Sequence, residues 1–270
     1  MGVVPVCRWN VVVKWLRLLK PTLWQIDISH YNEKARWALE HKGIDHVRRS
    51  TLPGMHIPVA LVLTRGDQPT LPVLQLDGRA IGDSTEIIAA LEAKYPEPQL
   101  YPTDPEELTR ALELEDWFDE NLGPHTRLLP FYELIQEPEI FAEVAAESVP
   151  GPLGKAKPVV GAYARAYTSL RWGANSDEDA QRAREAIVAA FDKLEAELEQ
   201  GEGEFLVGDS LSVADITAAS LFYPVVVPPE GPLDPTLPRP PALERFRESL
   251  KDRRGFKWVE ETFRKHRHRS

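Results

Sequence analysis

Residues 206–216 have the sequence LVGDSLSVADI, which contains a complete signal for the start of a helix. Ser212 and Asp215 have the spacing of an N-cap residue and the third helical residue of a capping box, with Asp in the usual place of Glu. Leu211 and Ile216 stand where two apolar side chains form a hydrophobic staple. The pattern therefore predicts a helix that starts at Ser212 and is stabilised by local contacts.

The chain around this segment has the pattern of a helical protein. Apolar residues recur at three- and four-residue spacing, as on the buried face of an amphipathic helix. The predicted helices span residues 106–121, 177–199, 212–222, 242–251 and 256–264. We therefore expect an all-helical bundle over residues 106–270.

The chain before residue 96 has a different pattern, in which short apolar runs alternate with helices. Expected strands cover residues 23–28, 45–51, 73–76 and 80–81, and expected helices cover residues 29–42, 58–63 and 84–94. Asp77-Gly78 lies between the last two strands and indicates a tight hairpin. This order predicts a small α/β domain with a mixed sheet over residues 22–95. The proline-rich stretch that follows predicts a stiff linker over residues 96–105.

The composition excludes several classes of protein. Of the 270 residues, 43% are hydrophobic and 27% are charged, which is typical of a folded domain with a core rather than a disordered chain. A formal net charge of −10 argues against a general nucleic-acid binder. The chain has one cysteine, Cys7, so it forms no internal disulfide and no Cys-rich zinc site. The seven histidines form no metal-ligand pattern, and we expect no metal.

The first 21 residues differ from the rest of the chain. Their apolar runs are interrupted by Arg8, Lys14, Arg17 and Lys20 and are too short to span a bilayer. A basic amphipathic segment of this kind is one route to a membrane surface. We favour the alternative, an N-terminal extension over residues 1–21 without membrane contact.

Two short motifs near the expected sheet have ligand-binding potential. A proline is tolerated at the first residue of a strand, and a cis bond between Leu71 and Pro72 would turn the preceding backbone outward to pair with an extended ligand. Asp83 and Ser84 open the helix expected over 84–94. We expect Ser84 to cap this helix, its free N–H groups to bind a carboxylate and Asp83 to accept from a ligand ammonium group.

These motifs together resemble those of the cytosolic-type glutathione S-transferases. The resemblance rests on LVGDSLSVADI, on the order of Leu71-Pro72-Val73 and Asp83-Ser84, and on Ile87-Ile88. It covers roughly residues 22–265 and implies an N-terminal thioredoxin-like domain followed by a C-terminal helical domain. It also implies glutathione as co-substrate, a small hydrophobic electrophile as partner, a homodimer and a cytoplasmic location.

The resemblance places the reactive position in residues 29–36, SHYNEKAR, which match the family pattern S/C-x-x-x-x-[KR]-x-R. It implies that Ser29 contacts the substrate thiol. Thiols have a pKa of about 8.5, so a hydroxyl donor and a helix N-terminus favour the thiolate at neutral pH. The competing role of Ser29 is a simple N-cap, and Asn32 is an alternative donor because its amide also donates. With no cysteine at this position, thioredoxin-type dithiol exchange is excluded.

The same resemblance implies the remaining site residues. The backbone of Leu71, before Pro72, would pair with the cysteinyl part of glutathione, and Asp83 and Ser84 would hold its γ-glutamyl end. Candidate partners for the glycyl carboxylate are His56 and Arg65. The expected electrophile pocket between the domains takes its candidates from Tyr31, Trp117, Arg127, Phe131, Tyr132 and Tyr163.

One segment departs from the family pattern, which has a short loop between the fourth and fifth helices. Here residues 136–175 intervene, and we expect this insertion to cover the electrophile site and narrow the choice of substrate. A second unusual loop is expected over residues 224–241, which are rich in proline.

The sequence thus predicts a glutathione S-transferase-like enzyme that transfers alkyl or aryl groups to sulfur. Two alternatives stay open. One is a non-catalytic glutathione- or protein-binding scaffold of the same fold, since fold does not determine function. The other is a glutathione-dependent lyase, isomerase or dehalogenase.

Overall fold

The computed structural model describes residues 20–51, 54–147, 156–172, 176–201 and 204–267. Most of the expected N-terminal extension, including Cys7, lies outside these residues. So does part of the expected insertion, residues 148–155 and 173–175.

The N-terminal half contains one four-stranded mixed sheet. Its strands are β1 (Thr22–Gln25), β2 (Val47–Ser50), β3 (Val73–Leu76) and β4 (Arg79–Gly82), in the spatial order β2-β1-β3-β4. β1 runs parallel to β2, whereas β3 runs antiparallel to both β1 and β4. The expected hairpin is confirmed: Asp77 and Gly78 both have positive φ, 51° and 78°, which a two-residue turn of this kind requires.

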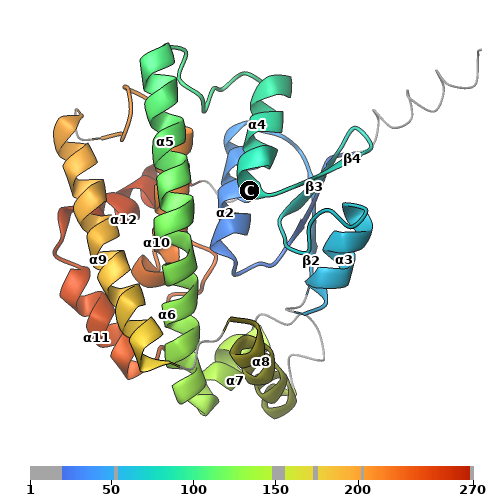
Figure 1. The fold of residues 1–270 in the computed structure, drawn as a ribbon, viewed down its shortest axis with the longest axis vertical. Helices are drawn as coiled ribbons and strands as arrows, with labels where there is room; N and C mark the ends of the chain where they lie inside the picture. Colours follow the sequence, from blue (N-terminus) through green and yellow to red (C-terminus); the bar gives the residue numbers. More distant parts are fainter. Residues whose placement is uncertain (1–19, 52–53, 148–155, 173–175, 202–203, 268–270) are drawn as a thin grey trace, which may run out of the picture.

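Helices cover the two faces of this sheet. They are α2 (His30–His41), α3 (His56–Leu63) and α4 (Ser84–Lys94). In Figure 1, α2 and α4 lie between the sheet and the helical half, and α3 lies on the far side. The expected thioredoxin-like domain is confirmed.

The C-terminal half is helical, as expected. Its helices are α5 (Pro105–Asn121), α6 (Gly123–Gln136), α7 (Pro138–Glu147), α8 (Lys157–Trp172), α9 (Asp177–Gln200), α10 (Val213–Val226), α11 (Pro241–Leu250) and α12 (Arg254–His266). Every residue of α10 is buried, and α10 packs against α2, α5 and α12 (Figure 1). Of the described helices, none is long and apolar enough to cross a membrane.

Several predicted boundaries differ from the structure, and two of the differences have a local reason. β1 ends at Gln25 rather than at residue 28, because the N–H of Ile26 donates to Asn32 Oδ1 at 3.1 Å. The loop expected from residue 224 starts only after Val226, since Pro224 is accommodated in the last turn of α10. Pro224 lacks the N–H that would donate to the carbonyl of Ser220, and the packing of the fully buried α10 stabilises the helix despite this loss.

The helix start at Ser212 has the predicted capping arrangement in the interior of the protein. Asp215 is fully buried, and its Oδ2 accepts from the backbone N–H of Ser212 at 2.8 Å and from Ser212 Oγ at 2.7 Å. Its Oδ1 accepts from the N–H of Leu206 at 2.8 Å. Burial raises the pKa of this carboxyl to about 6, although the hydrogen bonds act in the opposite direction. Asp215 therefore attaches residues 206–212 to the central helix.

We predict that D215A lowers the free energy of unfolding by about 2–4 kcal/mol, since it leaves buried donors unpaired. The midpoint of urea denaturation followed by circular dichroism measures the loss. The matched control is D209A, because Asp209 lies exposed in the same loop and its removal is expected to change the midpoint little. Equal midpoints for D215A and D209A would contradict the role given to Asp215.

Candidate active site

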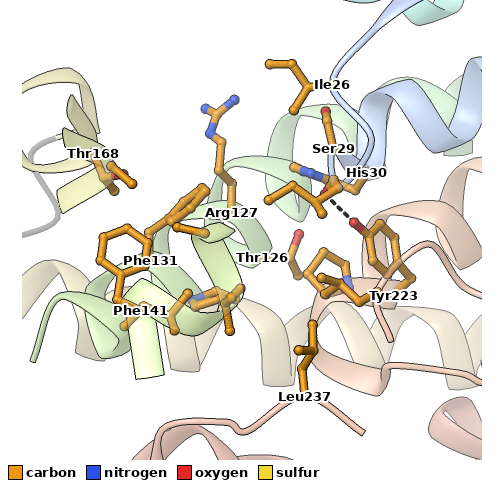
Figure 2. A pocket seen from close by; sticks show the side chains of 18 of the residues that line it. Ile26, Ser29, His30, Thr126, Arg127, Phe131, Phe141, Thr168, Tyr223 and Leu237 are labelled. Carbon is orange, nitrogen blue, oxygen red and sulfur yellow. Dashed lines mark hydrogen bonds between the residues drawn. The ribbon is translucent and has the colours of Figure 1, made fainter. Parts of the chain in front are cut away.

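One cavity of about 640 Å³ lies where the two halves of the chain meet. The thioredoxin-like half contributes the β1–α2 loop, the start of α3, the Leu71-Pro72 turn and the start of α4. The helical half contributes α6, α7, α8, the end of α10 and the loop before α11. The wall is mainly apolar, with a few polar side chains, which is typical of a site for a small molecule (Figure 2).

Ser29 occupies the N-cap position of α2 and lines the cavity. Its backbone is extended, with φ −83° and ψ 128°, but its hydroxyl makes no capping hydrogen bond to the helix. The expected role of a simple cap is therefore absent. The hydroxyl lies instead at the helix N-terminus, where the helix dipole gives a positive potential that favours an anion.

Asn32 lies behind the cavity wall rather than in it. It is completely buried, its Oδ1 accepts from the N–H of Ile26 at 3.1 Å, and its Nδ2 donates to the carbonyl of Leu71 at 3.2 Å. Asn32 thus joins the loop that carries Ser29 to the turn before β3. The expected alternative, in which Asn32 donates to the substrate thiol, is wrong because the side chain does not line the cavity.

His30 and Tyr31 attach the start of α2 to the helical half. His30 Nε2 donates to the carbonyl of Gly123 at 2.9 Å, and the Tyr31 hydroxyl donates to the carbonyl of Asp119 at 2.9 Å. A Cβ at Gly123 would lie 2.1 Å from the Tyr31 hydroxyl oxygen, so only glycine permits this approach. Burial, followed by the charge of Arg127, lowers the pKa of His30 to about 3, and its imidazole is neutral at physiological pH.

The residues expected to bind glutathione on the sheet side come together. The bond between Leu71 and Pro72 is cis, and both residues line the cavity with Asp83 and Ser84. The helix cap is Asp83 rather than Ser84: its Oδ1 accepts from the N–H of Thr85 at 2.8 Å. Asp83 has a φ of 68°, a conformation that costs a non-glycine residue roughly 1–3 kcal/mol and is common at functional sites.

Only one of the two candidates for the glycyl carboxylate reaches the cavity. His56 begins α3, is buried and lines the cavity, and its Nδ1 accepts from the N–H of Gly54 at 3.1 Å. Arg65 follows the end of α3, is exposed and lies outside the cavity wall. The expectation for Arg65 is wrong, because α3 ends before it and the chain turns away at a φ of 59°.

The structure places four of the candidates for the electrophile pocket in the cavity wall. Tyr31, Arg127, Phe131 and Tyr163 line the cavity. Two other candidates lie elsewhere. Trp117 packs edge-on against Phe118 at the helical core, with a ring separation of 5.2 Å. Tyr132, next to Phe131 on α6, faces away and donates its hydroxyl to Asp177 on α9.

The expected insertion forms part of the cavity wall. Its helices α7 and α8 pack closely, since a Cβ on Gly161 would lie 2.6 Å from Ala142 Cβ. Tyr163 extends from α8 to the thioredoxin-like half, where a Cβ on Gly54 would lie 2.2 Å from its hydroxyl oxygen. The insertion lines the cavity through Phe141, Val144, Ala145, Val159, Val160, Tyr163, Ala164, Thr168 and Arg171.

Several residues of the cavity wall were not among the predicted site residues. Tyr223 is fully buried on α10, and its hydroxyl donates to the carbonyl of Ile28, the residue before Ser29 (Figure 2). Thr126, Thr168 and Arg171 also line the cavity. Tyr223 stands out in the sequence as a residue with a hydroxyl within the apolar stretch of α10. The sequence does not identify its hydrogen-bond partner, Ile28, because the two residues are 195 positions apart.

The two halves of the chain match family models described as the glutathione S-transferase N-terminal domain, over residues 23–99, and C-terminal domain, over residues 177–249. Together these matches cover more than half of the chain. The chain belongs to the glutathione S-transferase family.

Individual relatives are distant. The chain is 25% identical to maleylacetoacetate isomerase of Rattus norvegicus over 211 residues, which is 74% of this chain and 76% of the relative. The structure of glutathione transferase GSTFuA3 from Phanerochaete chrysosporium matches with a TM-score of 0.62 at 18% identity, over 93% of this chain and 99% of that chain. The β-etherase LigF from Sphingobium sp. strain SYK-6 matches with a TM-score of 0.59 at 19% identity, over 90% and 100%. At these identities the two matches show a common fold and nothing further.

We predict that the neutral His30 makes the protein sensitive to acid. Its folded pKa of about 3 lies below the value of about 6.5 in an unfolded chain, so the unfolded state binds a proton first as the pH falls. The contribution of His30 to the free energy of unfolding is therefore complete above pH 6.5 and decreases between pH 6.5 and 3. The loss is roughly 2.7 kcal/mol at pH 4.5.

H30Q keeps a donor for Gly123 but does not titrate, and we expect its stability to fall less steeply between pH 6.5 and 4. Urea midpoints at several pH values measure this difference. H46Q, which replaces a histidine outside the cavity, is expected to keep the pH dependence of the unmodified protein. Parallel profiles for H30Q and the unmodified protein would rule out this role of His30.

Proposed function

We propose that this protein is a glutathione transferase, in which Ser29 stabilises the glutathione thiolate for attack on an electrophile in the cavity. The observation that carries this proposal is the position of Ser29. Its hydroxyl lies at the N-terminus of α2, makes no capping bond and lines a cavity shared by both halves of the chain.

A hydroxyl donor at a helix N-terminus can supply the free energy needed to lower the pKa of the glutathione thiol. Lowering the pKa of a thiol by two units, from about 8.5, requires about 2.7 kcal/mol. A hydrogen bond from a hydroxyl to a charged acceptor contributes about 1.5–3 kcal/mol, and a helix N-terminus contributes about 0.3–1 kcal/mol. Ser29 acts here as a donor and keeps its proton. It is not a nucleophile.

The sheet side of the cavity has groups that fit the rest of glutathione. An extended peptide pairs with backbone N–H and C=O groups, and Leu71 is positioned for this role by Asn32. Asp83 and the start of α4 suit the ammonium and carboxylate groups of the γ-glutamyl end. His56 lies on the same side and suits the glycyl carboxylate.

The opposite wall suits the second substrate. Phe131, Phe141 and Val160 give it an apolar surface, which favours a hydrophobic electrophile. In the transfer reaction the sulfur lone pair forms a bond to carbon, and the leaving group departs with the electron pair of the bond that breaks. The homodimer and the cytoplasmic location remain predictions.

A second reaction has support from the curated relatives, which include maleylacetoacetate isomerases from rat and from Mus musculus. In an isomerisation the thiolate adds to a conjugated double bond, the resulting single bond rotates and elimination regenerates the thiolate. The same Ser29 hydroxyl serves both reactions. Transfer consumes one glutathione for each product molecule, whereas isomerisation consumes none, so the stoichiometry separates the two.

We predict that S29A lowers kcat/KM at pH 7 by about 10- to 100-fold, the effect of losing one charge-assisted hydrogen bond. The measurement is the pH dependence of kcat/KM with glutathione and an activated aryl halide. The loss is expected to shrink as the pH approaches the pKa of the free thiol, since the thiolate then forms without help.

S29T is the conservative control, because it keeps a hydroxyl donor and is expected to retain more activity than S29A. S249A, on α11 and outside the cavity wall, is expected to match the unmodified protein. If S29A and the unmodified protein have the same pH dependence of kcat/KM, another group stabilises the thiolate. Failure of the unmodified protein to bind immobilised glutathione would favour the scaffold alternative.

A further inference from the structure

The peptide unit between Ile28 and Ser29 is held by hydrogen bonds on both sides. The N–H of Ser29 donates to the carbonyl of Ile26 at 3.1 Å. The carbonyl of Ile28 accepts from the hydroxyl of Tyr223 on α10 (Figure 2). A peptide unit is planar, so bonds at its two ends determine how the whole unit is oriented. This orientation in turn restricts where the Ser29 hydroxyl lies in the cavity.

The contacts of this loop come from both halves of the chain. The bond between Ser29 and Ile26 is local, and Arg36 of α2 donates its Nη2 to the carbonyl of Asp27 at 2.8 Å. Both of these bonds lie within the thioredoxin-like half. Tyr223 belongs to the helical half and is 195 residues away from its partner in the sequence. The helical half therefore takes part directly in holding the backbone next to Ser29.

Tyr223 is itself held firmly by its surroundings. It is fully buried in the last turn of α10, and its ring packs edge-on against Phe263 of α12 with a centroid separation of 6.5 Å. α10 in turn packs against α2, α5 and α12. Burial raises the pKa of the Tyr223 phenol, so the hydroxyl keeps its proton at physiological pH. The donor that binds the Ile28 carbonyl is thus well placed and permanently protonated.

Tyr223 also lines the cavity, which raises the question of whether it donates to the substrate instead. A tyrosine hydroxyl has one proton and donates one hydrogen bond. In this structure that bond goes to the carbonyl of Ile28. The thiolate donor at this end of the cavity is therefore Ser29, and Tyr223 acts on the reaction through Ser29.

We propose that Tyr223 is a positioning residue, which holds the Ser29 hydroxyl where it donates to the glutathione thiolate. This inference rests on the proposed function and adds a residue of the helical half to it. A hydrogen bond weakens steeply as its distance and angle depart from the preferred values. Stabilisation of a charge by a fixed donor therefore depends on how well that donor is held. Without the Tyr223 hydroxyl, Ser29 is still present but is held less well.

The test is Y223F, which removes the hydroxyl and keeps the ring. The pKa of the bound glutathione thiol is measured from the ultraviolet absorption of the thiolate as the pH is varied. We expect Y223F to raise this pKa by about 0.5–1 unit, and to lower kcat/KM by about 3- to 10-fold at a pH below it, the effect of losing one neutral hydrogen bond. The affinity for S-methylglutathione, which has no ionisable thiol, is expected to stay the same.

A double variant shows whether Tyr223 acts through Ser29. In the S29A background, Y223F is expected to lower kcat/KM by less than about twofold, because no Ser29 hydroxyl remains to be positioned. Equal factors in the two backgrounds would overturn the proposal. A lower midpoint of urea denaturation in Y223F together with an unchanged thiol pKa would also overturn it, since that result indicates a purely structural role.

Y132F is the matched control, because Tyr132 faces away from the cavity and its hydroxyl donates to Asp177. We expect Y132F to leave the thiol pKa and kcat/KM unchanged. Circular dichroism checks that each variant is folded. If Y223F does not fold, the replacement of Tyr223 by 3-fluorotyrosine decides. This residue keeps the ring and the donor, and its more acidic hydroxyl donates more strongly, so the thiol pKa is expected to fall. An unchanged thiol pKa would then overturn the proposal.

The thiol pKa of S29A separates this inference from the proposed function. If S29A leaves that pKa unchanged, the proposed function fails and the inference fails with it. If S29A raises the pKa and Y223F does not, the proposed function stands and only the role given to Tyr223 is wrong.

Discussion

Lys34 places one positive charge in the interior, at the point where α2, α4 and α5 meet. Its side chain is fully buried and lies 2.7 Å from Glu115, 2.6 Å from Asp119 and 2.9 Å from Thr85. A buried charge is tolerated only when its partners are correctly placed, so this cluster restricts how α2 docks on the helical half. Because Ser29 is the N-cap residue of α2, the position of its hydroxyl depends on this interior contact.

The two halves of the chain contribute different groups to the cavity. The sheet side carries Ser29, Leu71 and Asp83, whose positions are set by short loops and by backbone hydrogen bonds. The other side is built from α6, α7 and α8, which present Arg127 and Arg171 on a mainly apolar wall. Changes in the helical wall can therefore alter the choice of substrate without disturbing the group that activates sulfur.

Local signals predicted most of the elements. The hairpin at Asp77-Gly78 and the capped helix start at Ser212 depend on neighbours within a few residues, and both are present in the structure. The helices α6, α7 and α8 were not predicted individually. Pro130 lies inside α6, and prolines also start α7 and interrupt the sequence around α8, so the usual helix pattern is weak there. Packing against other helices stabilises these segments despite that weak pattern.

The sequence by itself determined the two-part organisation and the position of Ser29 at a helix start, because both follow from patterns of adjacent residues. Only the tertiary structure decided which candidates share one cavity. It buried Asn32 between Ile26 and Leu71, left Arg65 outside and placed Arg127 and Arg171 in the wall of the same cavity. The physical reason is that burial and side-chain direction depend on contacts between elements distant in sequence, which local periodicity does not specify.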